Sequence, residues 1–523
     1  MRQALRVNPR RQRVSQTASI PAPAQGWDAT NPISQIKPEN AVQLDNWTCR
    51  PGYVEVRKGY TEWSGEFADP VETLLVWRGP ASEKMFAAVS TRIYDVTTET
   101  TILTTALGSL TNARWQSVNF STAGGHFLIT VNGADTPRKY DGSTWAVTTI
   151  TGSGLTPADL IHVMAHKERL FFLEKDSLSF WYLGINAIAG AASEFPLGDI
   201  LPKGGNLVTF GTWSVDGGQG QDDLAVFVSS EGEAAVYQGL DPGDATEWAL
   251  VGVFDVGIPL GRRSLIKWGG DLALITSDGV VPLSTIILAD RSQASRAALT
   301  GRIQNGFADL ARRSLSSFGW QALAYPKGNL VIVNAPYQAG SAYWQLVMNS
   351  ITGAWSRWKG INALCWAILN DEIYFGGLTH VCRADRGSAD AGEPITADLT
   401  GAYLDYGSRG RWKQFKMMRP IFVTNRRVIP AIEMVTDFST LDPIAEQTEV
   451  TSNENNWGVG LWGVALWGSD DEVVKDWISI TGNGIVGAPR GRVVTQGGGA
   501  RTAVDNEIKL YSFDLLYETG EVL

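Results

Sequence analysis

One short unit recurs through the middle of the chain: an apolar run, a tight polar turn and a second apolar run. Copies lie at 86–94, 127–133, 170–178, 224–232, 272–279, 328–333 and 369–375. Each copy predicts a β-hairpin, because β-branched and aromatic residues flank turn dipeptides such as Asn-Gly and Asp-Gly, which adopt positive φ at low cost. The turns recur about every 40–50 residues, which is the spacing of propeller blades.

A single four-stranded blade cannot bury both of its faces, whereas a closed ring of blades can. The repeats therefore predict an all-β fold, with a β-propeller of about six to seven blades over residues 61–400. Twenty tryptophans and 56 glycines fit this expectation, since large rings fill the spaces between sheets and glycines form turns. A pair of β-sandwiches is the alternative that the approximate period leaves open.

The regions around the repeats have their own patterns. Within 286–315, the residues Ile303, Phe307 and Leu310 recur at helical spacing and predict one amphipathic helix inserted between blades. Longer strands are expected in a β-rich platform domain over 401–523. The N-terminal segment 26–60 is expected to pair with that domain, because closing a propeller often brings chain ends together.

Residues 1–25 form a basic segment without acidic residues, containing Arg10, Arg11 and Arg13 and then Pro21 and Pro23. This composition predicts an extended arm outside the core. The arm is either a solvated tail or a segment that becomes ordered against a partner or nucleic acid.

A Trp-Gly pair repeats every five residues at Trp457, Trp462 and Trp467. Neither a strand nor a helix places residues at this spacing on one face. The tract is therefore either core packing among bulged strands or an apolar interface or gate loop inserted into a neighbouring subunit.

Charge and cysteine content limit the classes of function. A net charge of −10 argues against a protein that binds nucleic acid over much of its surface, although a neutral or acidic conduit would let DNA slide. The odd set Cys49, Cys365 and Cys382 has no metal-ligand spacing and fits synthesis in a reducing cytoplasm. No segment has the length or apolarity of a membrane span, and no signal-peptide core follows the basic N-terminus.

Candidate chemistry is sparse. His162 and His166 have zinc-like spacing but lack the glutamate of H-E-x-x-H, and the glycines of 482–487 fit G-x-G-x-x-G without a following helix. The loop 216–223 is better explained as a glycine-rich connection than as a calcium site, and 141–145 is similar to the structural aspartate boxes of sialidase propellers. We therefore expect no enzyme activity, no metal and no cofactor, although two distant carboxylates could still meet in space.

Four stretches together resemble the tail hub or nozzle proteins of short-tailed bacteriophages, a group that includes the packaged-DNA stabilisation proteins. They are 43–59, 137–145, 347–355 and the C-terminal 515–520. The resemblance implies a propeller-bearing subunit that forms a homo-hexameric ring below the portal and its adaptor, extends the DNA channel and retains the packaged genome until ejection.

On this expectation the protein is a virion tail component made in the host cytoplasm. Its partners are further copies of itself, the portal and adaptor proteins, tail fibres and, transiently, genomic DNA without sequence specificity. Arg10, Arg11 and Arg13 would form the arm toward adaptor or DNA, and Trp457, Trp462 and Trp467 the interface or gate. Two other classes remain open: a carbohydrate-binding or glycan-processing propeller, and an interaction propeller inside a cell.

Overall fold

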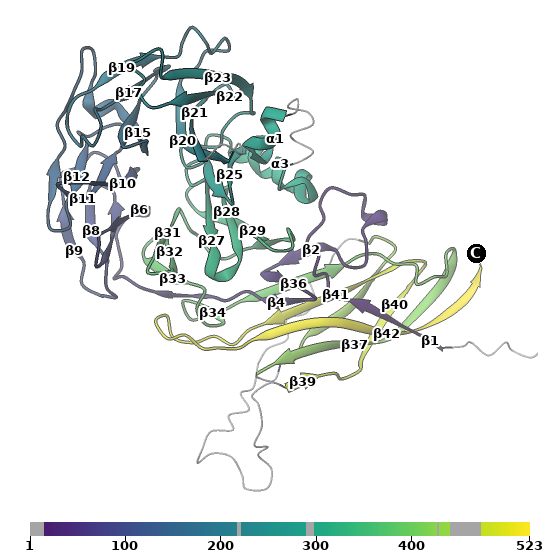
Figure 1. The fold of residues 1–523 in the computed structure, drawn as a ribbon. Coiled ribbons are helices and arrows are strands. Elements are labelled where there is room, and N and C mark those ends of the chain that lie inside the picture. Colours follow the sequence, from purple (N-terminus) through teal and green to yellow (C-terminus); the bar gives the residue numbers. More distant parts are fainter. Residues whose placement is uncertain (1–14, 217–220, 289–297, 426–427, 440–471, 523) are drawn as a thin grey trace, which may run out of the picture. The chain divides into compact units, whose positions relative to one another are not determined.

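The computed structural model describes residues 15–216, 221–288, 298–425, 428–439 and 472–522 (Figure 1). The chain divides into two compact units. Unit 1 comprises 1–56, 396–496 and 506–523, and unit 2 comprises 57–395 and 497–505. The sequence placed the corresponding boundaries at residues 60 and 400. Arg10, Arg11, Arg13, Trp457, Trp462 and Trp467 all lie outside the described residues.

Unit 2 is built from consecutive antiparallel sheets, each a meander of neighbouring strands. The first three are β6 (Val71–Arg78), β7 (Glu83–Val89), β8 (Arg92–Asp95) and β9 (Thr104–Leu107); β10 (Gln116–Thr122), β11 (Gly125–Val131), β12 (Arg138–Tyr140) and β13 (Trp145–Val147); and β15 (Leu160–His166), β16 (Arg169–Glu174), β17 (Ser179–Tyr182) and β19 (Ser193–Pro196). Two short strands, β14 (Ile150–Thr151) and β18 (Gly190–Ala191), pair in parallel beside them.

The later sheets continue the series. They are β20 (Leu207–Asp216), β21 (Gln221–Ser229), β22 (Glu233–Gly239) and β23 (Trp248–Asp255); β24 (Leu265–Trp268), β25 (Asp271–Thr276) and β26 (Gly279–Pro282); β27 (Gln321–Tyr325), β28 (Leu330–Gln338), β29 (Ala342–Asn349) and β30 (Trp355–Trp358); and β31 (Cys365–Leu369), β32 (Glu372–Gly376), β33 (Val381–Ala384) and β5 (Tyr60–Glu62). Among the described residues, six of these sheets thus contribute four strands each to the series and one contributes three, and the last sheet continues from β5 into β34 (Ala389–Asp390) and β35 (Glu393–Pro394).

The sheets close into a ring, as Figure 1 shows. The first strand of each sheet contacts the first strand of the next, in the order β6, β10, β15, β20, β24, β27 and β31, and β31 contacts β6 again. Strand β5 precedes the first blade in sequence yet pairs with β33 of the last. The prediction of an all-β propeller is confirmed, and the closed ring excludes a pair of sandwiches.

The core lies between adjacent blades. Between the first two, Leu75, Trp77 and Phe86 of one sheet pack against Leu128 and Tyr140 of the next, all buried. Alternating side chains on each strand supply these faces, so each blade buries the apolar surface of its neighbours.

In the described part of the chain, two helices follow the three-stranded blade: α1 (Leu283–Leu288) and α3 (Gln304–Ser314), the latter preceded by the 3-10 turn η3 (Gly301–Ile303). Phe307 and Leu310 are buried on one face of α3, which packs against β28. Helix α3 lies within 286–315, where the sequence predicts one amphipathic helix, whereas α1 begins before that stretch. No helix in the described part of the chain is long and apolar enough to span a bilayer.

Unit 1 contains two groups of strands. One has the order β3 (Trp47–Arg50), β4 (Tyr53–Val56), β42 (Ile508–Val522), β37 (Arg411–Thr424) and β39 (Glu472–Val474), with β40 (Ile478–Gly484) also on β37. The other has the order β2 (Ala41–Asp45), β36 (Thr396–Gly401), β41 (Gly487–Val494) and β38 (Ala431–Thr436). Of the N-terminal strands, β2 thus pairs with β36 and β4 pairs with β42, while β3 pairs with β4.

Strand β1 (Ser15–Pro21) pairs antiparallel with β42, from Ser15 opposite Glu518 to Pro21 opposite Ser512. Ile20 is buried in this pairing. The segment that the sequence assigns to an extended arm, 1–25, therefore contains a sheet strand, because the long strand β42 offers backbone groups that β4 leaves unpaired. Short elements complete the described fold: η1 (Ile33–Gln35), η2 (Pro157–Asp159), η4 (Pro326–Gly328), β34 (Ala389–Asp390) and β35 (Glu393–Pro394).

Candidate functional site

A pocket of about 390 Å³ lies within unit 2. Four cationic side chains, three carboxamides and an aromatic loop line it: Arg114, Lys175, Arg262, Arg263, Asn112, Gln116, Asn132, Phe318 and Trp320, with Gly133, Gly261, Gly319 and residues 315–317. These residues come from three different blades and the connection that follows α3, so the propeller ring is what brings them together.

The topology explains why these segments meet on one face. Residues 261–263 and 315–320 directly precede the innermost strands β24 and β27, and Arg263 bridges Gln321 in parallel. Gly133 and Lys175 follow the second strands of their blades, which run antiparallel to the innermost ones. All of them therefore lie on the face where the innermost strands begin.

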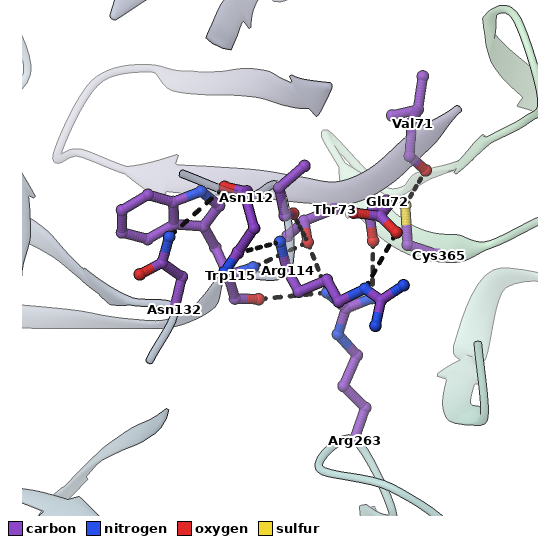
Figure 2. A network of polar contacts seen from close by, with 10 residues as sticks. Val71, Glu72, Thr73, Asn112, Arg114, Trp115, Asn132, Arg263 and Cys365 are labelled. Carbon is purple, nitrogen blue, oxygen red and sulfur yellow. Dashed lines mark hydrogen bonds and ion pairs between the residues drawn. The ribbon is translucent and has the colours of Figure 1, made fainter. Parts of the chain in front are cut away.

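Arg263, which lines the pocket, is held by a network of hydrogen bonds, as Figure 2 shows. Its Nη2 donates to Thr73 Oγ1 at 2.6 Å and to the carbonyl of Trp115 at 3.2 Å, and its Nη1 donates to the carbonyl of Glu72 at 3.2 Å. Thr73 Oγ1 in turn donates to the carbonyl of Ala113. Burial lowers the pKa of Arg263 below its ordinary value. The guanidinium is thus held by largely neutral partners, and its positive charge is not cancelled by a bonded carboxylate.

Arg114 belongs to the same network through Glu72 (Figure 2). Its Nε approaches Glu72 Oε1 at 3.0 Å, and its guanidinium carbon lies 4.6 Å from the centre of the Phe318 ring. The guanidinium carbon of Arg263 lies 5.3 Å from the same ring. Phe318 therefore positions two arginines by cation–π contacts, which favour a fixed spacing between like charges.

Arg262 differs from its neighbours. Within the described part of the chain, its guanidinium makes no hydrogen bond and no ion pair, although it is partly buried in the pocket wall. Burial, and then the charges of Arg114 and Arg263, lower its pKa, while Asp176 acts in the opposite direction. Burial and the two neighbouring arginines thus disfavour the charged form of Arg262, and Asp176 compensates for this only in part.

His162 lies behind Arg262 in the propeller core. Its Nε2 is 3.5 Å from Thr209 Oγ1, which donates to the Arg262 carbonyl at 3.3 Å. Burial, with a further contribution from Arg262, lowers the pKa of His162 to about 3. The imidazole is therefore neutral at pH 7 and adds no charge beside the pocket.

The arrangement has the chemistry of an anion site. Four cationic side chains line the pocket and its described lining includes no carboxylate, while Glu72 and Asp176 act on its arginines from outside that lining. Asp135, near the rim, is engaged by Asn132 and Thr111. The described residues contain no cluster of His, Cys, Asp or Glu that could hold a metal ion.

The structure separates the two histidines of the zinc-like pair. His162 contacts Thr209, whereas His166 Nδ1 lies 3.1 Å from Thr212 Oγ1 and its ring packs against Phe171. Both imidazoles belong to the contact between two blades, where they meet hydroxyl and aromatic groups.

The other candidate motifs are turns. Asp141 Oδ1 accepts hydrogen bonds from the amides of Ser143 and Thr144, which holds its pKa well below the ordinary value and closes the β12–β13 hairpin. The glycines of 482–487 lie in β40 and at the start of β41, which follows directly. The candidate calcium loop 216–223 joins β20 to β21, and its residues 217–220 lie outside the described residues. At its end, Asp223 accepts a hydrogen bond from Ser214 Oγ on the neighbouring strand.

Sequence reasoning did not identify the pocket. The pair Arg262–Arg263 was the only local signal, and adjacent arginines in a loop are common on protein surfaces. Arg114 stands well over a hundred residues away in sequence. Without the ring closure, nothing in the pattern shows that these positions converge.

No family model matches the sequence, and no curated protein matches it. Among solved structures, the chain is similar to Sqt1 of Saccharomyces cerevisiae at 11% identity, covering 62% of this chain and 99% of that one, with a TM-score of 0.38. It is also similar to YCF48 bound to D1 peptide at 11% identity, covering 64% and 95%, with a TM-score of 0.34.

A further similar structure is a quinonprotein alcohol dehydrogenase-like protein from Bacteroides thetaiotaomicron, at 10% identity over 60% of this chain and 68% of that one, with a TM-score of 0.35. Likenesses this distant carry no argument about activity or partners. The propeller assignment rests on the closed order of the sheets.

Proposed function

We propose that this chain is a structural subunit of the tail hub or nozzle of a short-tailed bacteriophage. In this proposal, six copies form a ring that extends the DNA channel below the portal and adaptor, retains the packaged genome and conducts it on ejection. The observation that carries the proposal is the placement of the four stretches that resemble this family. The stretch 43–59 includes β3 and β4, 137–145 and 347–355 lie in two blades, and 515–520 lies in β42.

The likeness thus involves both units and not the propeller alone. A likeness confined to hairpins of the ring would be expected for many unrelated propellers, because strand-and-turn sequence recurs among them. The stretches in β3, β4 and β42 belong to strands that pair with one another in unit 1. This combination supports the proposal that this chain and the tail hub or nozzle proteins share both a propeller and a second β unit.

The positions of the two candidate contact segments also support the proposal. The basic segment with Arg10, Arg11 and Arg13 directly precedes β1, and the tract with Trp457 and Trp462 is joined to β38 and β39. All three strands belong to unit 1. We therefore assign contacts with neighbouring subunits and the adaptor to unit 1, and the role of a rigid body to the propeller.

The proposed role is structural and requires no catalytic group. Each subunit of a closed ring makes two different contacts with its neighbours, and the ring closes only if the rotation between subunits is correct. Rigid β units fit that requirement. A net charge of −10 also fits a conduit that must release DNA. Contact with such a protein releases few counterions from the DNA, and the DNA is therefore bound only weakly.

The test is electron microscopy of particles from the producing culture, labelled with an antibody against this chain. We expect label at the tail, and mass measurement of the purified chain or its adaptor complex should give a hexamer. Particles without the protein would contradict the proposal and would direct the search to glycan arrays and cellular partners.

A further inference from the structure

We propose that the pocket at the face of the propeller binds a small anion that carries a phosphoryl group, with Arg262 as its principal ligand. This site lies outside the contacts assigned above to unit 1, and it does not depend on a role in a phage tail. The ligand class follows from charge, unsatisfied hydrogen-bonding capacity and size.

The charge favours a dianion. The pocket is lined by four cations, Arg114, Lys175, Arg262 and Arg263, and its described lining includes no carboxylate. A phosphate monoester carries about −1.5 to −2 charges at pH 7, whereas a carboxylate carries one. A phosphoryl group therefore neutralises the pocket more completely than a carboxylate does.

Arg262 supplies the unused donors. Its guanidinium makes no hydrogen bond or ion pair with the described residues, and the neighbouring Arg114 and Arg263 make its charge costly. A guanidinium presents a planar fork of donors that matches two oxygens of a phosphoryl group. The pocket thus contains a partly buried cation that makes no hydrogen bond to an acceptor among the described residues.

The neighbouring cations are already positioned before any ligand binds. Arg263 is held by Thr73 and two backbone carbonyls, and Arg114 is held by Glu72 and Phe318. Since these side chains are fixed, binding costs little additional side-chain entropy. Lys175 is exposed at the rim and makes no ion pair with the described residues, so it can approach a bound anion from the solvent side.

The size sets an upper limit on the ligand. A volume of about 390 Å³ lies at the lower end of pockets that bind small molecules, which run from about 300 to 1,000 Å³. Inorganic phosphate or a sugar phosphate fits such a space, whereas a nucleic-acid duplex does not. The proposed ligand is therefore a small phosphorylated compound.

The experiment is calorimetric titration of the full chain with inorganic phosphate, glucose 6-phosphate and acetate at pH 7.5. We expect saturable binding of one phosphoryl probe per chain, and binding of acetate at least about tenfold weaker, equivalent to about 1.4 kcal/mol. If glucose 6-phosphate binds more tightly than phosphate, the natural ligand is a phosphorylated metabolite; the reverse order indicates free phosphate.

The variant R262Q should weaken phosphate binding at least about tenfold without unfolding, because the Arg262 side chain makes no hydrogen bond or ion pair with the described residues. K175Q should cause a smaller loss, since that cation is exposed. The matched control is R78Q, because Arg78 ends β6 on the opposite face and pairs with Glu83. Three outcomes would overturn the proposal: no saturable binding at millimolar phosphate, unchanged binding by R262Q, or acetate binding as tightly as phosphate.

Discussion

Arg57 and Asp390 form an ion pair that joins the beginning of the propeller to its end. Nη1 of Arg57 donates to Oδ1 of Asp390 at 2.8 Å and Nη2 donates to Oδ2 at 2.5 Å. The Arg57 side chain has no exposed surface, and its Nη2 also donates to the carbonyl of Lys359. The pair therefore fixes the chain where β5 enters the last blade.

Asp390→Ala should destabilise unit 2 by about 3 kcal/mol or more, because it leaves the Arg57 cation buried without its counter-ion. The double variant Arg57→Met with Asp390→Leu should recover part of that loss, since it removes both charges. Denaturant unfolding monitored by tryptophan fluorescence measures both effects.

The control for this prediction is Asp309→Ala, which removes the exposed pair between Asp309 and Arg312 on α3. Exposed pairs contribute about 0–1 kcal/mol. A loss for Asp390→Ala as small as the control's would show that the buried pair does not stabilise ring closure.

Lys413 should be essential to unit 1. Its side chain is fully buried on β37, and Nζ donates to the carbonyls of Ser408 at 2.8 Å, Arg411 at 3.1 Å and Ile485 at 2.7 Å. Lys413→Met leaves three carbonyls without this donor and should lower the free energy of unfolding by about 3 kcal/mol. Chemical denaturation of the full chain provides the measurement.

Lys416→Met is the matched control on the same strand, because Lys416 is partly exposed and lies 3.8 Å from Glu518. Its effect should stay below about 1 kcal/mol. Equal effects of the two variants would mean that the Lys413 hydrogen bonds add nothing beyond the apolar part of the side chain.

Burial of His162 should make the propeller sensitive to acid. Burial lowers the folded-state pKa from the ordinary value of 6.5 to about 3, so between these pH values the unfolded chain binds a proton that the folded chain does not. Stability is therefore fully present above pH 6.5 and falls as the pH drops toward 3, by on the order of 4 kcal/mol in total.

His162→Gln should flatten this dependence between pH 7 and pH 4, as measured by denaturant unfolding at each pH. The control is His126→Gln, since His126 is partly exposed and contacts Ser121. If the slope with pH is the same in His162→Gln and in the unsubstituted chain, other groups cause the acid sensitivity.

The basic segment can be tested apart from the strand that follows it. Deleting residues 2–14 removes Arg10, Arg11 and Arg13 but keeps β1, so thermal stability should be unchanged while docking to the portal–adaptor complex weakens. Deleting residues 2–25 should also destabilise unit 1, because β1 pairs with β42 and buries Ile20. Undiminished docking after the shorter deletion would remove the arm from the proposed mechanism.

Trp462→Ala tests the interface or gate hypothesis. If the Trp-Gly tract contacts a neighbouring subunit, the variant should impair ring assembly or genome retention while the monomer unfolds at nearly the same denaturant concentration. Light scattering and unfolding of the same preparation separate these effects. A loss of stability of about 3–5 kcal/mol without an assembly defect would show that the Trp462 indole packs in the core of its own subunit.

The hairpin period was readable in the sequence because its causes are local. Turn dipeptides, alternating apolar residues and blade-length spacing act within about 50 residues, and they predicted the propeller. Phe307 and Leu310 likewise marked the buried face of α3, because helical periodicity depends only on neighbours along the chain.

Only the tertiary structure decided which distant residues meet. Thr73 and Arg263 lie 190 positions apart in sequence, and Arg57 and Asp390 lie 333 apart. Neither pair leaves a local pattern, because each depends on how many blades the ring contains and where it closes. The sequence by itself determined the repeating hairpins and the all-β ring, whereas the cationic pocket exists only because ring closure places loops from separate blades around one opening.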